Sequence, residues 1–184
     1  IGQMMEKVVL PPFKPRRTEE EIAEECPWAT TGRTKGRQPN IVTSLELDPA
    51  EMEKRNIELQ KKYRLIEENE VRYEEINCDD AEYLIVAFGS CARIAQKAMD
   101  DARAQGIKVG LLRPITLWPF PSKQIAERAK QVKGILSVEI NAGQMIEDIK
   151  LAVNCSVPVE HFGRLGGIVP DPDEVVNALK EKLM

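Results

Sequence analysis

The chain has 184 residues, of which 42% are hydrophobic and 30% are charged, and its net charge is −4. This length accommodates one full domain and an additional segment. The acidic balance excludes a general nucleic-acid binder, which needs a basic surface for phosphates. No apolar run approaches the roughly 18 residues that span a bilayer, and no signal peptide is visible, so no membrane association is expected.

Four cysteines are widely spaced along the chain, and His161 is its single histidine. Without a Cys-x-x-Cys pattern, an iron–sulfur or zinc site held by this chain alone is not expected. No catalytic residue and no metal ligand set is indicated. Reduced thiols predict a cytoplasmic location. The first residue is Ile1 rather than methionine, which favours a piece of a longer protein.

Residues 1–80 are predicted to form an irregular arm that ends in a linker helix. Six of the twelve prolines lie in this part, so irregular, extended backbone is expected between Pro11 and Asp48. A helix is predicted from Asp48 to about Asn69, because an Asp-Pro pair suits a helix start. Its narrow apolar stripe favours packing against one neighbour, while a solvated helix that touches its own domain stays open. The stripe consists of Met52, Leu59, Tyr63 and Ile66.

Residues 81–184 alternate between apolar runs and helices with one apolar face. Strands are predicted at residues 83–88, 107–112, 135–140 and 157–162, each followed by a helix. Ser90, Ser122 and Asp171 are suited to cap three of these helices. Strands joined by single helices need right-handed crossovers. The fold class is therefore α/β, a three-layer sandwich with a mostly parallel sheet of four or more strands, and the spacing allows one antiparallel strand.

Ligands of open α/β sheets bind beyond the carboxyl ends of the strands, where four loops of this domain meet. In the first loop, Ser90 offers either backbone N–H groups to an anion or a tight turn with a helix cap. Arg113 ends the second strand and is expected to pair with Glu139 on the neighbouring strand, or to bind an anionic ligand. Trp118 lies among prolines and is interpreted as an anchor, either on the sheet or on another subunit.

Glu139, Asn141 and Gly143 belong to the third loop. A small-anion site requires that Arg113 and the N–H groups of Ser90 and Gly143 converge on one pocket. The fourth loop, residues 163–167, is rich in glycine, but it lacks the lysine of phosphate-binding loops, which favours a connector. A nucleotide-dependent reductase or transferase is disfavoured, because no G-x-G-x-x-G fingerprint is present.

One long motif resembles a known family. Residues 112–121 (LRPITLWPFP), together with residues 87–93 (AFGSCAR) and 69–75 (NEVRYEE), resemble the alpha subunit of 2-oxoacid:ferredoxin oxidoreductases. Within that family they look most like the branched-chain (2-ketoisovalerate) or 2-oxoglutarate enzymes. The resemblance implies a transketolase C-terminal-like domain at residues 81–184. Residues 1–80 then form the tail of a missing pyrimidine-binding domain, whose end looks like residues 30–33.

The resemblance also implies what the whole enzyme does. It oxidatively decarboxylates a 2-oxoacid to an acyl-CoA, using thiamine diphosphate, Mg²⁺, iron–sulfur clusters and coenzyme A, and passes electrons to ferredoxin. None of these cofactors is expected to be bound by this chain alone, because the glutamate that activates thiamine and the cluster cysteines are missing. The chain is expected to be a non-catalytic structural domain that meets the beta and gamma subunits. Exposed apolar surface also predicts a homo-oligomer. An autonomous small-anion module is the alternative.

Overall fold

The computed structural model describes residues 9–29, 41 and 43–184 of the chain. The contacts divide these residues into two units, an arm up to residue 58 and a domain from residue 59 to residue 184. The motif at residues 30–33 lies outside the described residues. In the described part of the chain, no helix is long and apolar enough to cross a membrane.

A short helix, α1 (Glu19–Glu25), lies in the arm and begins with a capping box. The Thr18 hydroxyl accepts the Glu21 N–H at 3.2 Å, and the Glu21 carboxylate accepts the Thr18 N–H at 2.7 Å. The expectation of irregular backbone between Pro11 and Asp48 is wrong at this place. The reason is that one reciprocal cap satisfies the first N–H groups of a helix without any tertiary contact.

Helix α2 (Pro49–Asn69) begins where the sequence predicts it. The Asp48 carboxylate accepts the N–H of Ala50 at 2.8 Å, as expected of an N-cap. The helix buries none of its residues. Tyr63, on the predicted apolar stripe, places its ring edge-on to Trp118, with the ring centroids 5.7 Å apart. This contact lies within the domain, because both Tyr63 and Trp118 follow residue 59.

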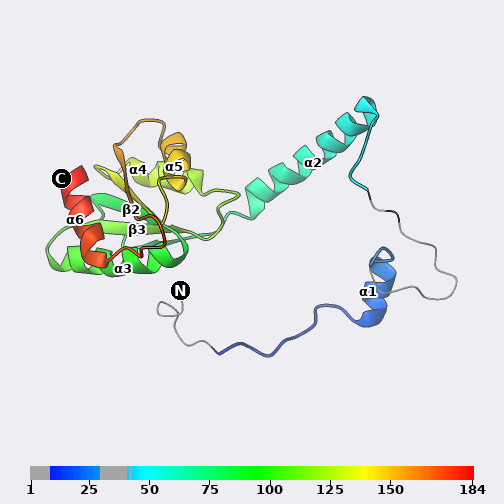
Figure 1. Cartoon of the computed structure of the whole chain (residues 1–184), viewed down its shortest axis with the longest axis horizontal. Helices are drawn as coiled ribbons and strands as arrows, with labels where there is room; N and C mark the ends of the chain where they lie inside the picture. The colour runs from blue at the N-terminus through cyan, green and yellow to red at the C-terminus, as the bar shows by residue number, and fades with distance from the viewer. Residues whose placement is uncertain (1–8, 30–40, 42) are drawn as a thin grey trace. The chain divides into compact units, whose positions relative to one another are not determined.

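The domain is built on a five-stranded sheet in the order β1-β3-β2-β4-β5 (Figure 1). Its strands are β1 (Tyr73–Ile76), β2 (Tyr83–Ala87), β3 (Val109–Pro114), β4 (Ile135–Glu139) and β5 (Val159–Gly163). The edge strand β1 pairs antiparallel with β3, and the other neighbours pair in parallel. The predicted α/β sandwich with a mostly parallel sheet is confirmed.

Four helices cover the sheet. Helices α3 (Gly89–Ala104) and α6 (Pro172–Leu183) lie on one face, and α4 (Ser122–Ala129) and α5 (Met145–Val153) lie on the other (Figure 1). Alternate residues of β2 point to opposite faces, so Ile85 joins the core under α3 while Leu84 and Val86 join the core under α4. All of β2 is buried, as expected of a strand covered on both faces.

Two of the three predicted helix caps differ from the structure. Helix α3 begins at Gly89, so Ser90 lies inside its first turn, and α4 begins at Ser122 itself. Asp171 is confirmed as the N-cap of α6, within a capping box. A serine near a helix start is thus a weaker guide than Asp-Pro-x-Glu, in which the carboxylates and the proline act together.

Strand β1 lies before residue 81, the predicted start of the domain. Its two central residues, Glu74 and Glu75, are charged, so no apolar run marks the strand. It forms because the residues of β1 pair with those of β3, which follow more than thirty positions later. The sheet therefore begins at Tyr73, inside the segment that is predicted to be the arm.

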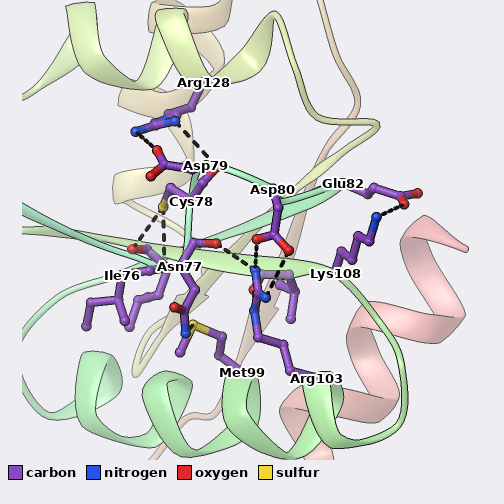
Figure 2. Close-up of polar contacts among 12 residues, drawn as sticks. Ile76, Asn77, Cys78, Asp79, Asp80, Glu82, Met99, Arg103, Lys108 and Arg128 are labelled. Carbon is purple, nitrogen blue, oxygen red and sulfur yellow. Dashed lines mark hydrogen bonds and ion pairs between the residues drawn. The ribbon is translucent and has the colours of Figure 1, made fainter.

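The connection from β1 to β2 is held by an arginine on each face of the sheet (Figure 2). On the α3 side, the Arg103 guanidinium donates to the carbonyl oxygens of Asn77 and Val109, both at 2.7 Å. It also donates to the Asp80 carboxylate at 2.6 Å, and this bond lowers the pKa of Asp80. A single side chain thus satisfies backbone carbonyls of the connection and of β3.

On the α4 side, Arg128 holds the same connection. Its Nε and Nη2 donate to the two carboxylate oxygens of Glu75 at 3.0 and 2.5 Å, and Nη2 also reaches Asp79 at 3.2 Å. The two-point bond to Glu75 is the strongest geometry available to an arginine and a carboxylate, and it raises the pKa of Arg128 above its ordinary value.

Replacing Arg128 with alanine is expected to lower the free energy of unfolding by about 2–3 kcal/mol, because Glu75 is left three-quarters buried without its cation. Lys130→Ala is the matched control. It removes an ion pair with Glu127 in which both side chains are two-thirds exposed, and it is expected to cost less than about 1 kcal/mol. Urea unfolding followed by circular dichroism measures both. Equal losses would show that Arg128 does not hold the connection.

Candidate functional site

The loops that follow strands β2 to β5 meet at the carboxyl edge of the sheet, where ligands of parallel sheets bind. Five of the six candidate residues lie in these loops or at the strand ends that lead into them, and Ser90 lies in the first turn of α3. The structure gathers Glu139, Asn141 and Gly143 into one cluster around the start of α5. It holds Arg113 in a separate pair on the other side of β2.

The buried carboxylate of Glu139 lies at the N-terminus of α5. Its Oε2 accepts the N–H groups of Gln144 at 3.0 Å and Met145 at 2.9 Å, and its Oε1 accepts that of Ile146 at 3.0 Å. The Ser137 hydroxyl donates to Oε1 at 2.9 Å. One side chain therefore supplies acceptors to N–H groups that have no partner within the helix.

These contacts fix the charge of Glu139. Burial by itself raises the pKa of this carboxyl group, but the N–H groups of Gln144 and Met145 and the Ser137 hydroxyl outweigh burial and lower it. The carboxylate is ionised at neutral pH and lies at the positive end of the α5 dipole. A side chain of the chain itself thus occupies the place where an external anion binds in other helix-terminus sites.

Asn141 and Gly143 complete the turn between β4 and α5. The Asn141 Oδ1 accepts the Gly143 N–H at 2.7 Å, and Gly143 has a φ of +106°, which favours glycine. His161 of β5 lies beside them, with its Nε2 3.9 Å from the Glu139 carboxylate, buried and without a hydrogen-bond partner. A β-carbon on Gly163 would lie 2.4 Å from the Asn141 carbonyl oxygen and 2.6 Å from the His161 ring. The cluster is closely packed by backbone and ring atoms.

Arg113 pairs with Glu74 of β1, with 3.0 Å between its Nη1 and the carboxylate. The expected pair with Glu139 is wrong, because β2 lies between β3 and β4 and the two residues are not on neighbouring strands. Glu74 is the residue directly opposite Arg113 in the β1–β3 register. The guanidinium and the Gly143 N–H each have a partner within the chain, which weighs against the small-anion module.

Ser90 lies in the first turn of α3, next to the buried Cys91. Burial, with a smaller contribution from the charge of Glu139, raises the pKa of the Cys91 thiol to about 11. Burial also raises the pKa of Cys78. Both thiols are protonated at neutral pH, and neither is suited to act as a nucleophile.

The proline-rich loop after β3 is hydrogen-bonded to Arg72. The Arg72 carbonyl oxygen accepts the N–H groups of Ile115 at 2.9 Å and Thr116 at 3.1 Å. The Thr116 hydroxyl oxygen accepts the Arg72 N–H at 3.0 Å, and the hydroxyl donates to the Pro119 carbonyl oxygen at 2.9 Å. One threonine thus closes the loop on itself and fastens it to the segment before β1.

Trp118 is held out at the surface of this loop. Its side chain is 55% exposed, and its ring contact is with Tyr63 of α2. The sheet-anchor interpretation is not supported, since a ring that packed on the sheet would be buried. The interpretation as a contact for another subunit stays a prediction.

Sequence reasoning missed three residues that build this edge: Glu74, Thr116 and Ser137. Ser137 lies two positions before Glu139 in an otherwise apolar strand, so the two side chains share a face, and this spacing was a usable signal. Glu74 is recognisable as a partner of Arg113 only from the strand order, which the sequence pattern does not give.

Among residues 9–29, 41 and 43–184, no group of three or more His, Cys, Asp or Glu side chains is arranged to hold a metal ion. The four cysteines are unpaired thiols at scattered positions. A cavity of about 430 Å³ lies at the amino end of β5, away from the carboxyl edge, and is lined by Lys150, Val153, Cys155 and residues 156–159. The cavity is thus separate from the candidate residues at the carboxyl edge.

Residues 81–175 match a family model described as pyruvate:ferredoxin oxidoreductase core domain II. The chain is 46% identical to the ketoisovalerate oxidoreductase subunit VorB of Methanothermobacter marburgensis, over 98% of this chain and 49% of that protein. The 2-oxoglutarate synthase subunit KorA of the same organism is 33% identical over 55% of this chain and 27% of its own length. The chain thus spans about half the length of its ketoisovalerate oxidoreductase relatives.

Two solved structures share the fold. A 2-oxoglutarate:ferredoxin oxidoreductase from Magnetococcus marinus superposes with a TM-score of 0.65 at 24% identity, covering 76% of this chain and 24% of that one. A split-gene transketolase, described as an inactive beta4 tetramer, gives a TM-score of 0.53 at 18% identity, over 61% of this chain and 41% of the other. The transketolase-like fold that the family resemblance implies is confirmed.

Proposed function

Since the chain belongs to the pyruvate:ferredoxin oxidoreductase core domain II family, we propose that it is the non-catalytic assembly domain of a 2-oxoacid:ferredoxin oxidoreductase alpha subunit. Ketoisovalerate is the 2-oxoacid we propose for the whole enzyme, because the identity to VorB extends over nearly the entire chain. The whole enzyme would convert it to an acyl-CoA and pass the electrons to ferredoxin.

The carrying observation is that the carboxyl edge of the sheet is filled by the domain's own groups. The Glu139 carboxylate lies where an anion would bind at the start of α5, and the Glu74 carboxylate forms an ion pair with the Arg113 guanidinium. An edge whose charges are paired internally is suited to hold a fixed shape rather than to bind a substrate. The chemistry is therefore proposed for the part of the relatives' length that this chain does not span.

The cofactors of the whole enzyme do not fit the described residues of this chain. Thiamine diphosphate needs a diphosphate site with Mg²⁺, yet the helix terminus best placed for an anion holds a carboxylate. Iron–sulfur clusters need converging thiolates, but the four thiols of this chain lie at scattered positions. In addition, burial raises the pKa of the Cys78 and Cys91 thiols, which disfavours the thiolate form. We propose that other parts of the enzyme hold these groups.

The proposed partners are the beta and gamma subunits of the oxidoreductase, with ferredoxin reached through the whole enzyme, in the cytoplasm. The names of these relatives support a multisubunit setting, since each is described as a subunit. The exposed aromatic loop around Trp118 supports an assembly role, because aromatic side chains are enriched in the cores of protein interfaces.

Two measurements on the 184-residue chain test this function. A tagged chain co-expressed with the other subunits is expected to retain them on an affinity column, and failure to retain any of them would contradict the assembly role. Calorimetric titration with thiamine diphosphate and Mg²⁺ is expected to give no saturable heat. Saturable binding would overturn the non-catalytic assignment, whatever the column shows.

A further inference from the structure

A cavity of about 430 Å³ lies between the last turn of α5 and the first residue of β5. Its buried lining is apolar, since Val153 is 4% exposed and Val157 is 8% exposed. Lys150, Cys155 and Ser156 also line the cavity, and these three residues are exposed. An apolar floor below a polar opening is the usual composition of a small-molecule site, and the volume lies in the range of such sites.

The loop that frames the cavity is held by hydrogen bonds to the end of α5. Asn154 has a φ of +47° and Cys155 has a φ of +61°, so the chain turns directly after the helix. The Asn154 N–H donates to the Lys150 carbonyl oxygen at 3.1 Å, and the Ser156 N–H donates to the Val153 carbonyl oxygen at 3.0 Å. The opening is thus formed before a ligand arrives, and binding there costs little ordering entropy.

The charge at the opening selects the head group of a ligand. The lining contains one cation, Lys150, and no carboxylate. Among residues 9–29, 41 and 43–184, no carboxylate forms an ion pair with the Lys150 ammonium. Phosphate groups are typically held by several N–H donors or by the fork of an arginine, whereas one lysine matches one negative charge. A carboxylate is therefore the head group that fits.

The size of the cavity sets the length of the apolar part. A volume of about 430 Å³ holds roughly 14 atoms of the size of a water molecule, at ~30 Å³ each. A short acid such as acetate fills only a small part of this space, whereas a medium-chain acid such as decanoate fills most of it. The aliphatic side chains of the floor match an aliphatic tail, which loses its contact with water on binding.

We infer that the cavity at the amino end of β5 binds a medium-chain aliphatic carboxylate. The tail lies against Val153 and Val157, and the carboxylate pairs with the Lys150 ammonium at the opening. The inference goes beyond the proposed assembly role, because the cavity shares no lining residue with the carboxyl edge of the sheet or with the proline-rich loop. It gives the domain a ligand site of its own.

The thiol of Cys155 reports whether the cavity is occupied, because it is exposed and lines the opening. The 184-residue chain is treated with N-ethylmaleimide, and mass spectrometry of its peptides gives the alkylation rate at each cysteine. With a Kd of about 1 mM, as expected for a ligand of this size, ~5 mM decanoate slows the alkylation of Cys155 about sixfold. The rate at Cys26, in the arm, is expected to stay unchanged. An unchanged rate at Cys155 up to about 10 mM decanoate overturns the inference.

The head group and the tail are tested separately. Lys150→Gln is expected to raise the Kd for decanoate about fivefold, since it removes an exposed ion pair. Lys123→Gln, at an exposed lysine of α4 outside the cavity, is the matched control and is expected to keep the wild-type Kd. Acetate has the head group without the tail, and decylamine has the tail with the opposite charge, so neither is expected to protect Cys155. Equal protection by decylamine and decanoate would overturn the assignment of a carboxylate.

Two further outcomes separate a small ligand from a protein partner. If the co-expressed subunits protect Cys155 and decanoate does not, the cavity is a contact for another subunit, so the inference fails and the proposed assembly role stands. If decanoate protects Cys155 and no subunit is retained on the affinity column, the proposed function fails and the inference stands. Far-UV circular dichroism establishes that both lysine variants are folded.

Discussion

Replacing Glu139 with alanine is expected to lower the free energy of unfolding by about 3–5 kcal/mol, the largest loss of any polar substitution in the domain. The change leaves the N–H groups of Gln144, Met145 and Ile146 without an acceptor, and two of these three residues are buried. It also removes the negative charge from the positive end of the α5 dipole. Urea unfolding gives the free energy, and amide hydrogen exchange at Met145 and Ile146 shows whether the loss is local to the start of the helix.

The matched control is Glu147→Gln, which removes an exposed carboxylate from the same first turn of α5. It is expected to change the free energy of unfolding by less than about 1 kcal/mol, because an exposed charge near a helix end is screened. A loss at Glu147 as large as that at Glu139 would mean that helix charge, rather than the buried hydrogen bonds, sets the stability of this edge.

The same carboxylate gives the protein a pH dependence of known sign. The pKa of Glu139 is lowered in the folded state, so the group stabilises the fold above its unfolded pKa, about 4.3 for a glutamate. This stabilisation is lost as the pH falls through the lower pKa of the folded state. Unfolding measured from pH 7 downward is therefore expected to show the stability of wild type converging on that of Glu139→Gln below about pH 4. A difference that is constant with pH would contradict this.

Gly163→Ala is expected to cost about 2–4 kcal/mol, the second large effect. The added β-carbon would lie 2.4 Å from the Asn141 carbonyl oxygen and 2.6 Å from the His161 ring, so the end of β5 has to move away from the turn after β4. The backbone torsion at Gly163 is not in the left-handed region, so the cost arises from the collision itself. Thermal unfolding and the amide spectrum of the turn measure the effect.

Gly134→Ala is the control, because its added β-carbon meets a flexible side chain rather than backbone. Its β-carbon would lie 2.7 Å from the end of the Leu183 side chain, in the last turn of α6. Leu183 is only partly buried and can rotate, so the expected cost is about 1 kcal/mol or less. Equal losses of unfolding free energy at the two glycines would show that the backbone around Asn141 moves away from the added β-carbon as easily as the Leu183 side chain rotates away from it.

Much of the fold follows from local patterns in the chain. The fully buried β2 reads as an unbroken apolar run, and Asp171 marks the start of α6 through a capping box that needs no tertiary contact. Strand β1 cannot be predicted from local patterns, because its central glutamates are stabilised by Arg113 and Arg128, which lie 39 and 53 residues away in the sequence. Its existence depends on pairing that only the folded chain reveals.

In the candidate site, too, the contacts between neighbours in sequence could be predicted, whereas the contacts between strands could not. Glu139, Asn141 and Gly143 are neighbours in sequence, and the structure keeps them together. The predicted partner of Arg113 was wrong because the sheet inserts β2 between the two strands, and strand order is set by crossovers rather than by residue pattern. The unpartnered Nε2 of His161 had no sequence signal, since it depends on how β5 lies against the turn.

The carboxylate at the start of α5 is attached to the strand that precedes the helix, and this attachment has a thermodynamic consequence. A tethered group reaches its acceptor position at an effective concentration of order millimolar or higher, independent of what the solvent contains. A free phosphate or carboxylate metabolite has to displace that internal competitor before it gains a single N–H contact. Changes in the cell's anion pool therefore leave this edge of the domain in the same conformation.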